Sequence, residues 1–178
     1  MGLPVSSMPR PALGTSALSN RRKIVETDTE NPGNNMLSNL ALVTTDAARR
    51  FGDKTALIFE GRRMSFGETD RLACRLANAL AGIGIKPGDR VTLYAQNCWE
   101  WIVAYYGILK TGAVVNPVNV MLTPAEIGYV TRDCGARAIL ASADKGEALL
   151  DIRKDTPLET IMLFGGAGPA GAVAFDTT

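Results

Sequence analysis

The chain has 178 residues, of which 46% are hydrophobic and 21% are charged, and its formal net charge is +1. This composition is typical of a globular protein with one core, and it offers no electrostatic basis for binding nucleic acid or an anionic membrane. The sequence contains no histidine, which excludes Ser–His and Cys–His catalysis, histidine metal ligands and a histidine general base. No apolar run approaches the roughly 18 residues that a membrane-spanning helix needs, so we expect no transmembrane segment.

Two further features bear on location and domain organisation. The three cysteines, Cys74, Cys98 and Cys134, show no CxxC spacing, and their odd number fits a reducing cytoplasm. Residues 1–35 are rich in proline, serine and polar residues, which predicts a disordered N-terminal extension. Three alternatives remain open for this extension: a myristoylation signal at Met1-Gly2, a transit peptide, or a natural start at Met36.

From Leu37 the spacing of apolar residues changes to that of regular secondary structure. Leu37–Phe51 has helical spacing, and Thr55–Phe59 with Arg63–Ser65 reads as a hairpin around the two-residue turn Glu60-Gly61. Ser65-Phe66-Gly67-Glu68 has the pattern of a capping box. The helix that it opens carries Leu72, Leu76 and Leu80 on one face, with small residues that would allow close packing against a sheet.

The stretch Lys86–Tyr129 contains a strand, a helix, a second strand and another helix, with turn residues at the junctions. Val91–Ala95 is a short apolar run typical of a buried parallel strand. Asn97 is placed to cap the following helix, Cys98–Lys110, which is apolar on nearly every face and is therefore predicted to be buried. Gly107 in its interior indicates that another backbone passes close by. Gly112 ends this helix in a left-handed conformation.

The second half of that unit and the rest of the chain continue the alternation. Val114–Val115 is the next strand, and Thr123-Pro124-Ala125-Glu126 is a capping box with proline at the first helical position. Further strands are expected at Ala138–Ala141 and Thr160–Phe164, with a short helix at Asp144–Ile152 between them. Because connections of this kind are right-handed, the sequence predicts an α/β fold with a parallel sheet and flanking helices.

Near the C-terminus, Gly166-Ala167-Gly168-Pro169-Ala170-Gly171 satisfies the GxGxxG pattern of dinucleotide-binding proteins. That site needs a helix that begins in the loop and an acidic residue about 20 positions further on. Only seven residues follow Gly171, and Ala172-Val173 stand where a phosphate-binding loop would have lysine and a hydroxyl residue. A flexible loop is the better interpretation of this segment.

Three other sets of residues could carry chemistry. Cys98 lies at a helix N-terminus, which lowers a thiol pKa, but its bulky apolar neighbours favour a small core residue. The aromatic residues between Trp99 and Tyr106 could stack on nucleotide bases, but without a basic groove they are better explained as core packing. Polar residues that lie near the carboxyl ends of strands, where open α/β sheets bind ligands, are Asn97, Asn116, Asn119 and Ser142.

Residues 37–165 together resemble the N-terminal portion of AMP-forming acyl-CoA synthetases, the family of adenylate-forming enzymes that includes luciferases and 4-coumarate ligases. The resemblance implies the N-terminal subdomain of that fold, incomplete here, within residues 36–178. The segments that carry it are Ala56–Glu68, Arg75–Leu80, Gly88–Val91, Asn97, Tyr106–Asn119, Leu122–Val130 and the run that ends at Ser142.

Members of this family convert a carboxylic acid, ATP and coenzyme A into acyl-CoA, AMP and pyrophosphate. The family's Ser/Thr/Gly-rich phosphate loop, its later motifs and its C-terminal lysine have no counterpart in this chain. The resemblance therefore implies an N-terminal fragment of a ligase for fatty or aromatic acids, inactive alone, whose partner is the remainder of the synthetase domain or another subunit. We assign no catalytic, cofactor-binding or metal-ligating residue, and ATP, magnesium and coenzyme A are implied only for the full-length enzyme. The alternative is a non-catalytic binding or assembly module that kept the fold.

Overall fold

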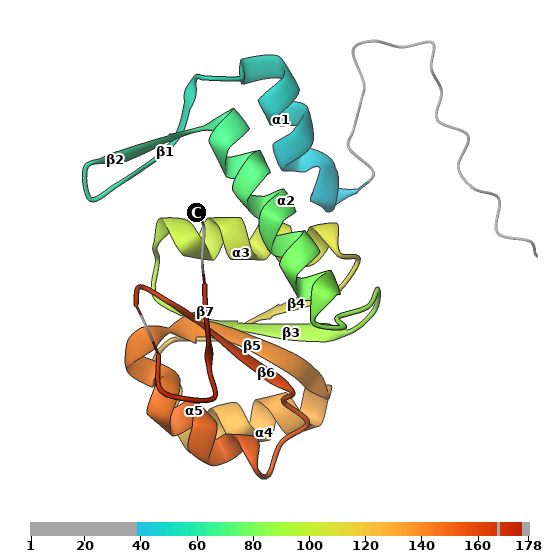
Figure 1. Cartoon of the computed structure of the whole chain (residues 1–178), viewed down its shortest axis with the longest axis vertical. Helices are drawn as coiled ribbons and strands as arrows, with labels where there is room; N and C mark the ends of the chain where they lie inside the picture. Colours follow the sequence, from blue (N-terminus) through green and yellow to red (C-terminus); the bar gives the residue numbers. More distant parts are fainter. Residues whose placement is uncertain (1–38, 167, 176–178) are drawn as a thin grey trace, which may run out of the picture. The chain divides into compact units, whose positions relative to one another are not determined.

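The structure is a computed structural model that describes residues 39–166 and 168–175 (Figure 1). The predicted disordered extension, residues 1–35, and the targeting alternatives for it lie outside the described residues. Within the described part of the chain, no helix is long and apolar enough to cross a membrane.

A parallel sheet of five strands forms the centre of the fold, in the order β4–β3–β5–β6–β7. The predicted α/β fold with a parallel sheet is thereby confirmed. Strand β7 was not predicted, because it has only two residues and follows a glycine-rich loop. The strands are β3 (Arg90–Tyr94), β4 (Val114–Pro117), β5 (Ala136–Ser142), β6 (Thr160–Phe164) and β7 (Val173–Ala174).

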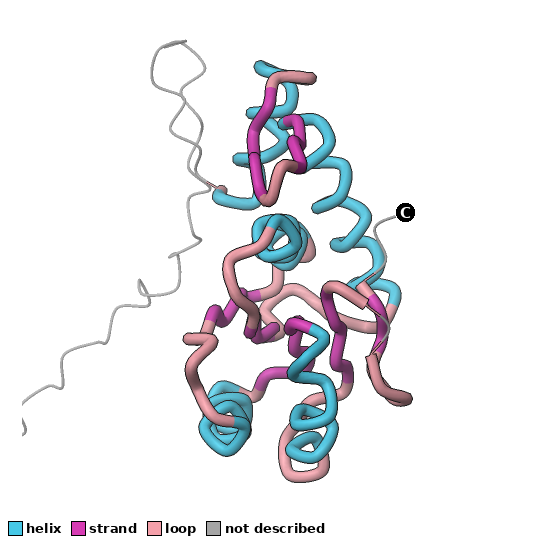
Figure 2. Tube along the Cα trace, turned by 90° about the vertical axis from the view of Figure 1, so that its left-hand side faces the viewer, coloured by secondary structure: helices cyan, strands magenta, loops and turns pink. Residues whose placement is uncertain are grey.

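Helices cover both faces of this sheet (Figures 1 and 2). Helix α3 (Trp99–Lys110) lies on one face. The sequence predicted that α2 (Phe66–Gly82) packs on the sheet, but α2 packs chiefly on α3. Helices α4 (Pro124–Cys134) and α5 (Gly146–Arg153) lie on the other face. The short 3-10 turns η1 (Leu40–Leu42) and η2 (Ala143–Lys145) lead into α1 (Val43–Phe51) and α5.

The core is divided in two by the sheet, because successive side chains of a strand point to opposite faces. In β6, Met162 and Phe164 join the cluster on the α3 side, whereas Ile161 and Leu163 join the cluster on the α4 and α5 side. The same alternation holds in β3 and β5. Since β3, β5 and β6 are buried on both faces, these three strands read as largely apolar runs, and this pattern made them recognisable in the sequence.

Strands β1 (Thr55–Phe59) and β2 (Arg62–Ser65) form the predicted hairpin, separate from the main sheet. Its turn residues Glu60 and Gly61 both have positive φ, 48° and 80°, as a two-residue turn of this hand requires. The base of the hairpin is fixed by backbone hydrogen bonds from Phe66 to Lys54 and from Gly67 to Gly52. The hairpin is therefore anchored to the start of α2.

Helix ends follow the predictions in two cases and depart from them in two others. Thr123 and Glu126 form the complete predicted capping box at α4, and Gly112 has the predicted positive φ, 79°, after α3. At α2 only half of the box forms: Ser65 accepts from the amide of Glu68, while the Glu68 carboxylate binds Arg62 instead.

The prediction that Asn97 caps α3 was wrong. Cys98 is the N-cap residue, and no side chain there accepts a hydrogen bond from the helix. Asn97 stands one position too early for that role, and its side chain is exposed.

A group of polar side chains joins α1, α2 and α3. The Lys110 ammonium lies 2.8 Å from an Asp70 oxygen and donates to the Thr45 hydroxyl at 2.6 Å. Thr44 and Thr45 both donate to the same carboxylate. Burial raises the pKa of Asp70, but hydrogen bonds from Lys110, Thr44 and Thr45 outweigh burial and hold that pKa below its ordinary value.

Candidate functional site

The strand order places a topological switch point between β3 and β5. From β3 the chain passes through α3 to β4 on one side, and then through α4 to β5 on the other side. In open α/β sheets, ligands bind outside the carboxyl ends of the strands near such a point. The residues that follow β3 and β4 are therefore the first place to look for a site.

The four polar residues predicted at this edge are not brought together into one site. The Asn116 amide donates to the Thr92 hydroxyl at 3.3 Å and to the Cys134 sulfur at 3.4 Å, so it joins β4 to neighbouring elements. Asn119 accepts a hydrogen bond from the amide of Met121 within a turn. Ser142 is the last residue of β5, opposite Phe164 of β6. Of the four, Asn97 alone lines a pocket described below.

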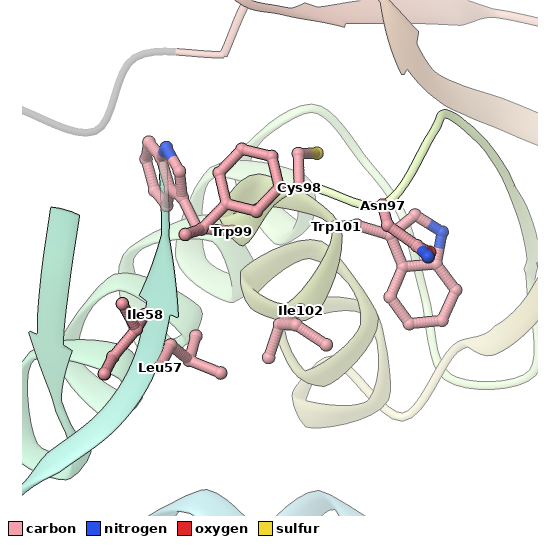
Figure 3. Close-up of a pocket in the computed structure, with 8 residues that line it drawn as sticks. Leu57, Ile58, Asn97, Cys98, Trp99, Trp101 and Ile102 are labelled. Atoms are coloured by element: carbon pink, nitrogen blue, oxygen red, sulfur yellow. The ribbon is translucent and has the colours of Figure 1, made fainter. Parts of the chain in front are cut away.

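One pocket lies at the N-terminus of α3, beneath the hairpin, and has a volume of about 160 Å³. We call it the head pocket (Figure 3). The hairpin and the start of α3 contribute its walls, and no wall residue carries a charge. The residues that line it are Leu57, Ile58, Phe59, Asn97, Cys98, Trp99, Trp101 and Ile102.

Cys98 has a thiol that remains protonated at neutral pH. Burial, with a smaller contribution from the nearby Glu100 carboxylate, raises the pKa of this thiol to about 11. The helix N-terminus favours a thiolate, but loss of hydration outweighs it here. Cys98 is partly buried and packs against the core cluster on the α3 side, in agreement with the interpretation of this residue as part of the packing.

A second pocket lies at the carboxyl ends of β3 and β4, with a volume of about 580 Å³. We call it the edge pocket, and it shares Asn97 and Trp101 with the head pocket. Trp101 stacks on Tyr105 with ring centroids 5.4 Å apart and an interplanar angle of 13°. The residues that line the edge pocket are Ala95, Gln96, Asn97, Trp101, Val118, Val120 and Met121.

Neither pocket is suited to phosphate or to a metal ion. Both linings consist of apolar and neutral polar side chains, without a cation to offset phosphate charge. Across residues 39–166 and 168–175, no three His, Cys, Asp or Glu side chains cluster where they could hold a metal ion. The linings of the head pocket and the edge pocket therefore do not supply the charges that a magnesium–ATP complex needs.

The strongest charge network lies at the opposite edge, at the amino ends of the strands. Arg137 binds Asp89 at 2.6 Å and also pairs with Glu159. The guanidinium of Arg137 lowers the pKa of Glu159, and a hydrogen bond from the Lys86 amide, together with Arg137, lowers the pKa of Asp89. These charges join β3, β5 and β6, so their role is structural.

The glycine-rich loop near the C-terminus does not have the geometry of a nucleotide site. In the described part of residues 165–172, no helix begins, and the chain returns directly to β7. Pro169 lies against Gly146 at the start of α5, and the Arg153 guanidinium donates to the Gly171 carbonyl. This placement agrees with the interpretation of the segment as a loop.

Sequence reasoning missed one contact at the head pocket. The Arg62 guanidinium lies over the Trp99 ring, 4.0 Å from its centroid, and pairs with Glu68 at 3.1 Å. It thereby holds the hairpin tip against the start of α3. Nothing in the local sequence around either residue points to the other, because the contact depends on how the hairpin folds back.

Comparison with known proteins identifies relatives along almost the whole described fold. The family model described as AMP-binding enzyme matches residues 44–174. A crotonobetaine/carnitine–CoA ligase of Salmonella typhimurium is 36% identical over 139 residues, which cover 74% of this chain and 27% of the relative. The corresponding protein of Salmonella typhi matches with the same identity and coverage.

Solved structures of ligases align with the same region. An anthranilate CoA ligase in complex with anthranoyl-AMP aligns with a TM-score of 0.73 and 30% identity, over 77% of this chain and 27% of that chain. A benzoate CoA ligase from Burkholderia xenovorans aligns with a TM-score of 0.68 and 26% identity, over 76% and 27%. The chain thus spans 27% of the length of these relatives.

Proposed function

The chain belongs to the AMP-binding enzyme family, and we propose that it is the N-terminal portion of an ATP-dependent acyl-CoA ligase. The proposed overall reaction has two steps. A carboxylate oxygen attacks the α-phosphorus of ATP and displaces pyrophosphate, which gives an acyl-adenylate. The thiol of coenzyme A then attacks the acyl carbon, so that the thioester forms and AMP leaves.

The observation that carries the proposal is the family match over residues 44–174, a range that contains every strand of the described fold. A fatty or aromatic acid is the substrate class that we propose, because named relatives include ligases for anthranilate, benzoate and fatty acids. We place the enzyme in the cytoplasm, in keeping with its three free cysteines.

The role that we assign to this portion is that of a scaffold. Stabilisation of transferring phosphoryl groups needs cations and oriented donors, and the two pockets offer no cation. We therefore assign ATP, magnesium and coenzyme A to the remainder of the synthetase domain, which is the partner of this chain in the same or another polypeptide. The described residues contribute a sheet that is covered on both faces by helices, and the remainder is held against the outside of this layered portion.

A hybrid enzyme tests the proposal. Residues 39–175 would replace the matching segment of the crotonobetaine/carnitine–CoA ligase, and acid-dependent thioester formation would be measured. We expect the hybrid to form the thioester with the relative's own acid. A hybrid that melts cooperatively but forms no thioester would contradict the proposal and favour a non-catalytic module.

A further inference from the structure

Helix α3 has two apolar faces, and this chain buries one of them. Val103, Ala104, Gly107 and Ile108 are buried against α2 and the sheet. Trp101, Ile102 and Tyr105 are only partly buried, although Trp101 and Tyr105 also pack against the edge of the core cluster on the α3 side. The prediction of a buried helix is therefore correct for one face of α3 and not for the other. A helix that is apolar all round is ordinarily covered on all sides.

The partly exposed side belongs to a set of apolar residues around the two pockets, which we call the Trp101 face. It consists of Ile58, Trp101, Ile102, Tyr105 and Met121. Ile58, Trp101 and Ile102 line the head pocket (Figure 3). Trp101 is also a wall of the edge pocket, which Met121 lines as well. At its two ends Ile58 is 63% exposed and Met121 is 82% exposed.

The chemistry of this surface specifies an apolar partner. The pockets on either side of Trp101 are lined by no charged side chain. The charged residue at the end of α3, Lys110, is already paired with Asp70 on α2. A partner that covers the Trp101 face would therefore contact mainly aromatic and aliphatic groups, together with the Asn97 and Gln96 amides. At the hairpin end it would also meet Glu60, Arg62 and Glu100, which line an adjoining pocket.

We propose that the Trp101 face is the surface on which the remainder of the synthetase domain packs. This inference rests on the proposed function and adds the location of the contact. The chain matches 27% of the length of its relatives, so most of such a domain is available to cover this face. A contact within one folded domain does not lose the translational and rotational freedom that association of a second copy loses. Residues 1–38, rich in proline and polar groups, match an apolar surface poorly.

Hydroxyl-radical footprinting tests the location without any substitution. The modification rates of Trp101 and Met121 would be compared between the isolated chain 1–178 and the hybrid enzyme. Both rates should fall about tenfold in the hybrid, because the core of a protein interface excludes water. Tyr129, on the outer side of α4 and 65% exposed, is the internal control and should keep its rate.

Three results would overturn the inference. The first is equal reactivity of Trp101 and Met121 in the hybrid and in the isolated chain. The second is protection in the isolated chain that disappears on dilution, which would identify a second copy as the cover. The third is protection that disappears when residues 1–35 are removed. A hybrid in which Trp101 is protected but which forms no thioester would refute the proposed function and support this contact. An active hybrid in which Trp101 stays reactive would support the proposed function and refute this contact.

Discussion

Gly107 allows the packing of α2 on α3 to be tested with one methyl group. A Cβ atom at this position would lie 2.7 Å from Cδ2 of Leu76 and 3.0 Å from its Cβ and Cγ. The neighbour is thus a side chain of α2, not a backbone as the sequence led us to expect. Two of the three close atoms sit near the root of the Leu76 side chain, so a rotation about its last bond does not relieve the contact.

The expected change in the free energy of unfolding is the balance of two effects. Alanine in a helix interior is favoured over glycine by about 1 kcal/mol, whereas overpacking of a core costs about 1–3 kcal/mol. We therefore expect Gly107→Ala to lower the free energy of unfolding by about 1 kcal/mol, and Gly107→Leu to lower it further.

Gly128 provides the matched control, since it is also buried in a helix interior. The nearest atom to a Cβ there would be a guanidinium nitrogen of Arg132, at 3.5 Å. Gly128→Ala should therefore raise the free energy of unfolding by up to about 1 kcal/mol.

Urea denaturation, followed by circular dichroism, measures the change in the free energy of unfolding for Gly107→Ala and for Gly128→Ala. In the Leu76→Ala background, which removes Cγ and Cδ2 of the three crowding atoms and keeps only Cβ, Gly107→Ala should destabilise less than it does in the wild-type chain. The reasoning is refuted if Gly107→Ala and Gly128→Ala are equally stabilising in the wild-type chain.

Three other predictions concern charge, the hairpin and the N-terminus. Asp70→Asn should lower the free energy of unfolding by about 1.5–3 kcal/mol at neutral pH. Because the folded-state pKa of Asp70 lies below 3.8, this difference should be present above that value and shrink as the pH falls through the folded-state pKa. Arg62→Ala should cost about 0.5–1 kcal/mol and change tryptophan emission, while an equal loss in Glu68→Ala would assign the effect to the ion pair instead of the ring contact. A chain that starts at Met36 should melt within a few degrees of the full chain, and a larger fall would show that the extension is docked.

The regular part of the fold was predictable because its signals are local. The capping box at Thr123 and the glycine after α3 each depend on residues within four positions of one another. The apolar runs of β3, β5 and β6 follow from burial on both faces of a parallel sheet. The predicted N-cap of α3, Asn97, was wrong by one residue. Cys98 is the N-cap, in extended conformation, and it begins the helix without a side-chain hydrogen bond.

Contacts between distant residues were not predictable from one sequence. Lys110 binds Thr45 across 65 positions, and Thr44 binds Asp70 across 26. The Trp101 face was also missed, because an apolar helix gives the same pattern whether its second face is covered by this chain or by another segment. At the strand ends, asparagine is a common turn residue as well as a ligand, and the structure assigns Asn119 to a turn.

The central claim is that this portion is a scaffold whose chemistry depends on the remainder of the synthetase domain. Acid-dependent exchange of labelled pyrophosphate into ATP tests it most directly, with the purified chain 1–178 and the hybrid enzyme measured side by side. We predict that the isolated chain shows no exchange above background with any fatty or aromatic acid, while the hybrid exchanges. Acid-dependent exchange by the isolated chain would contradict the account.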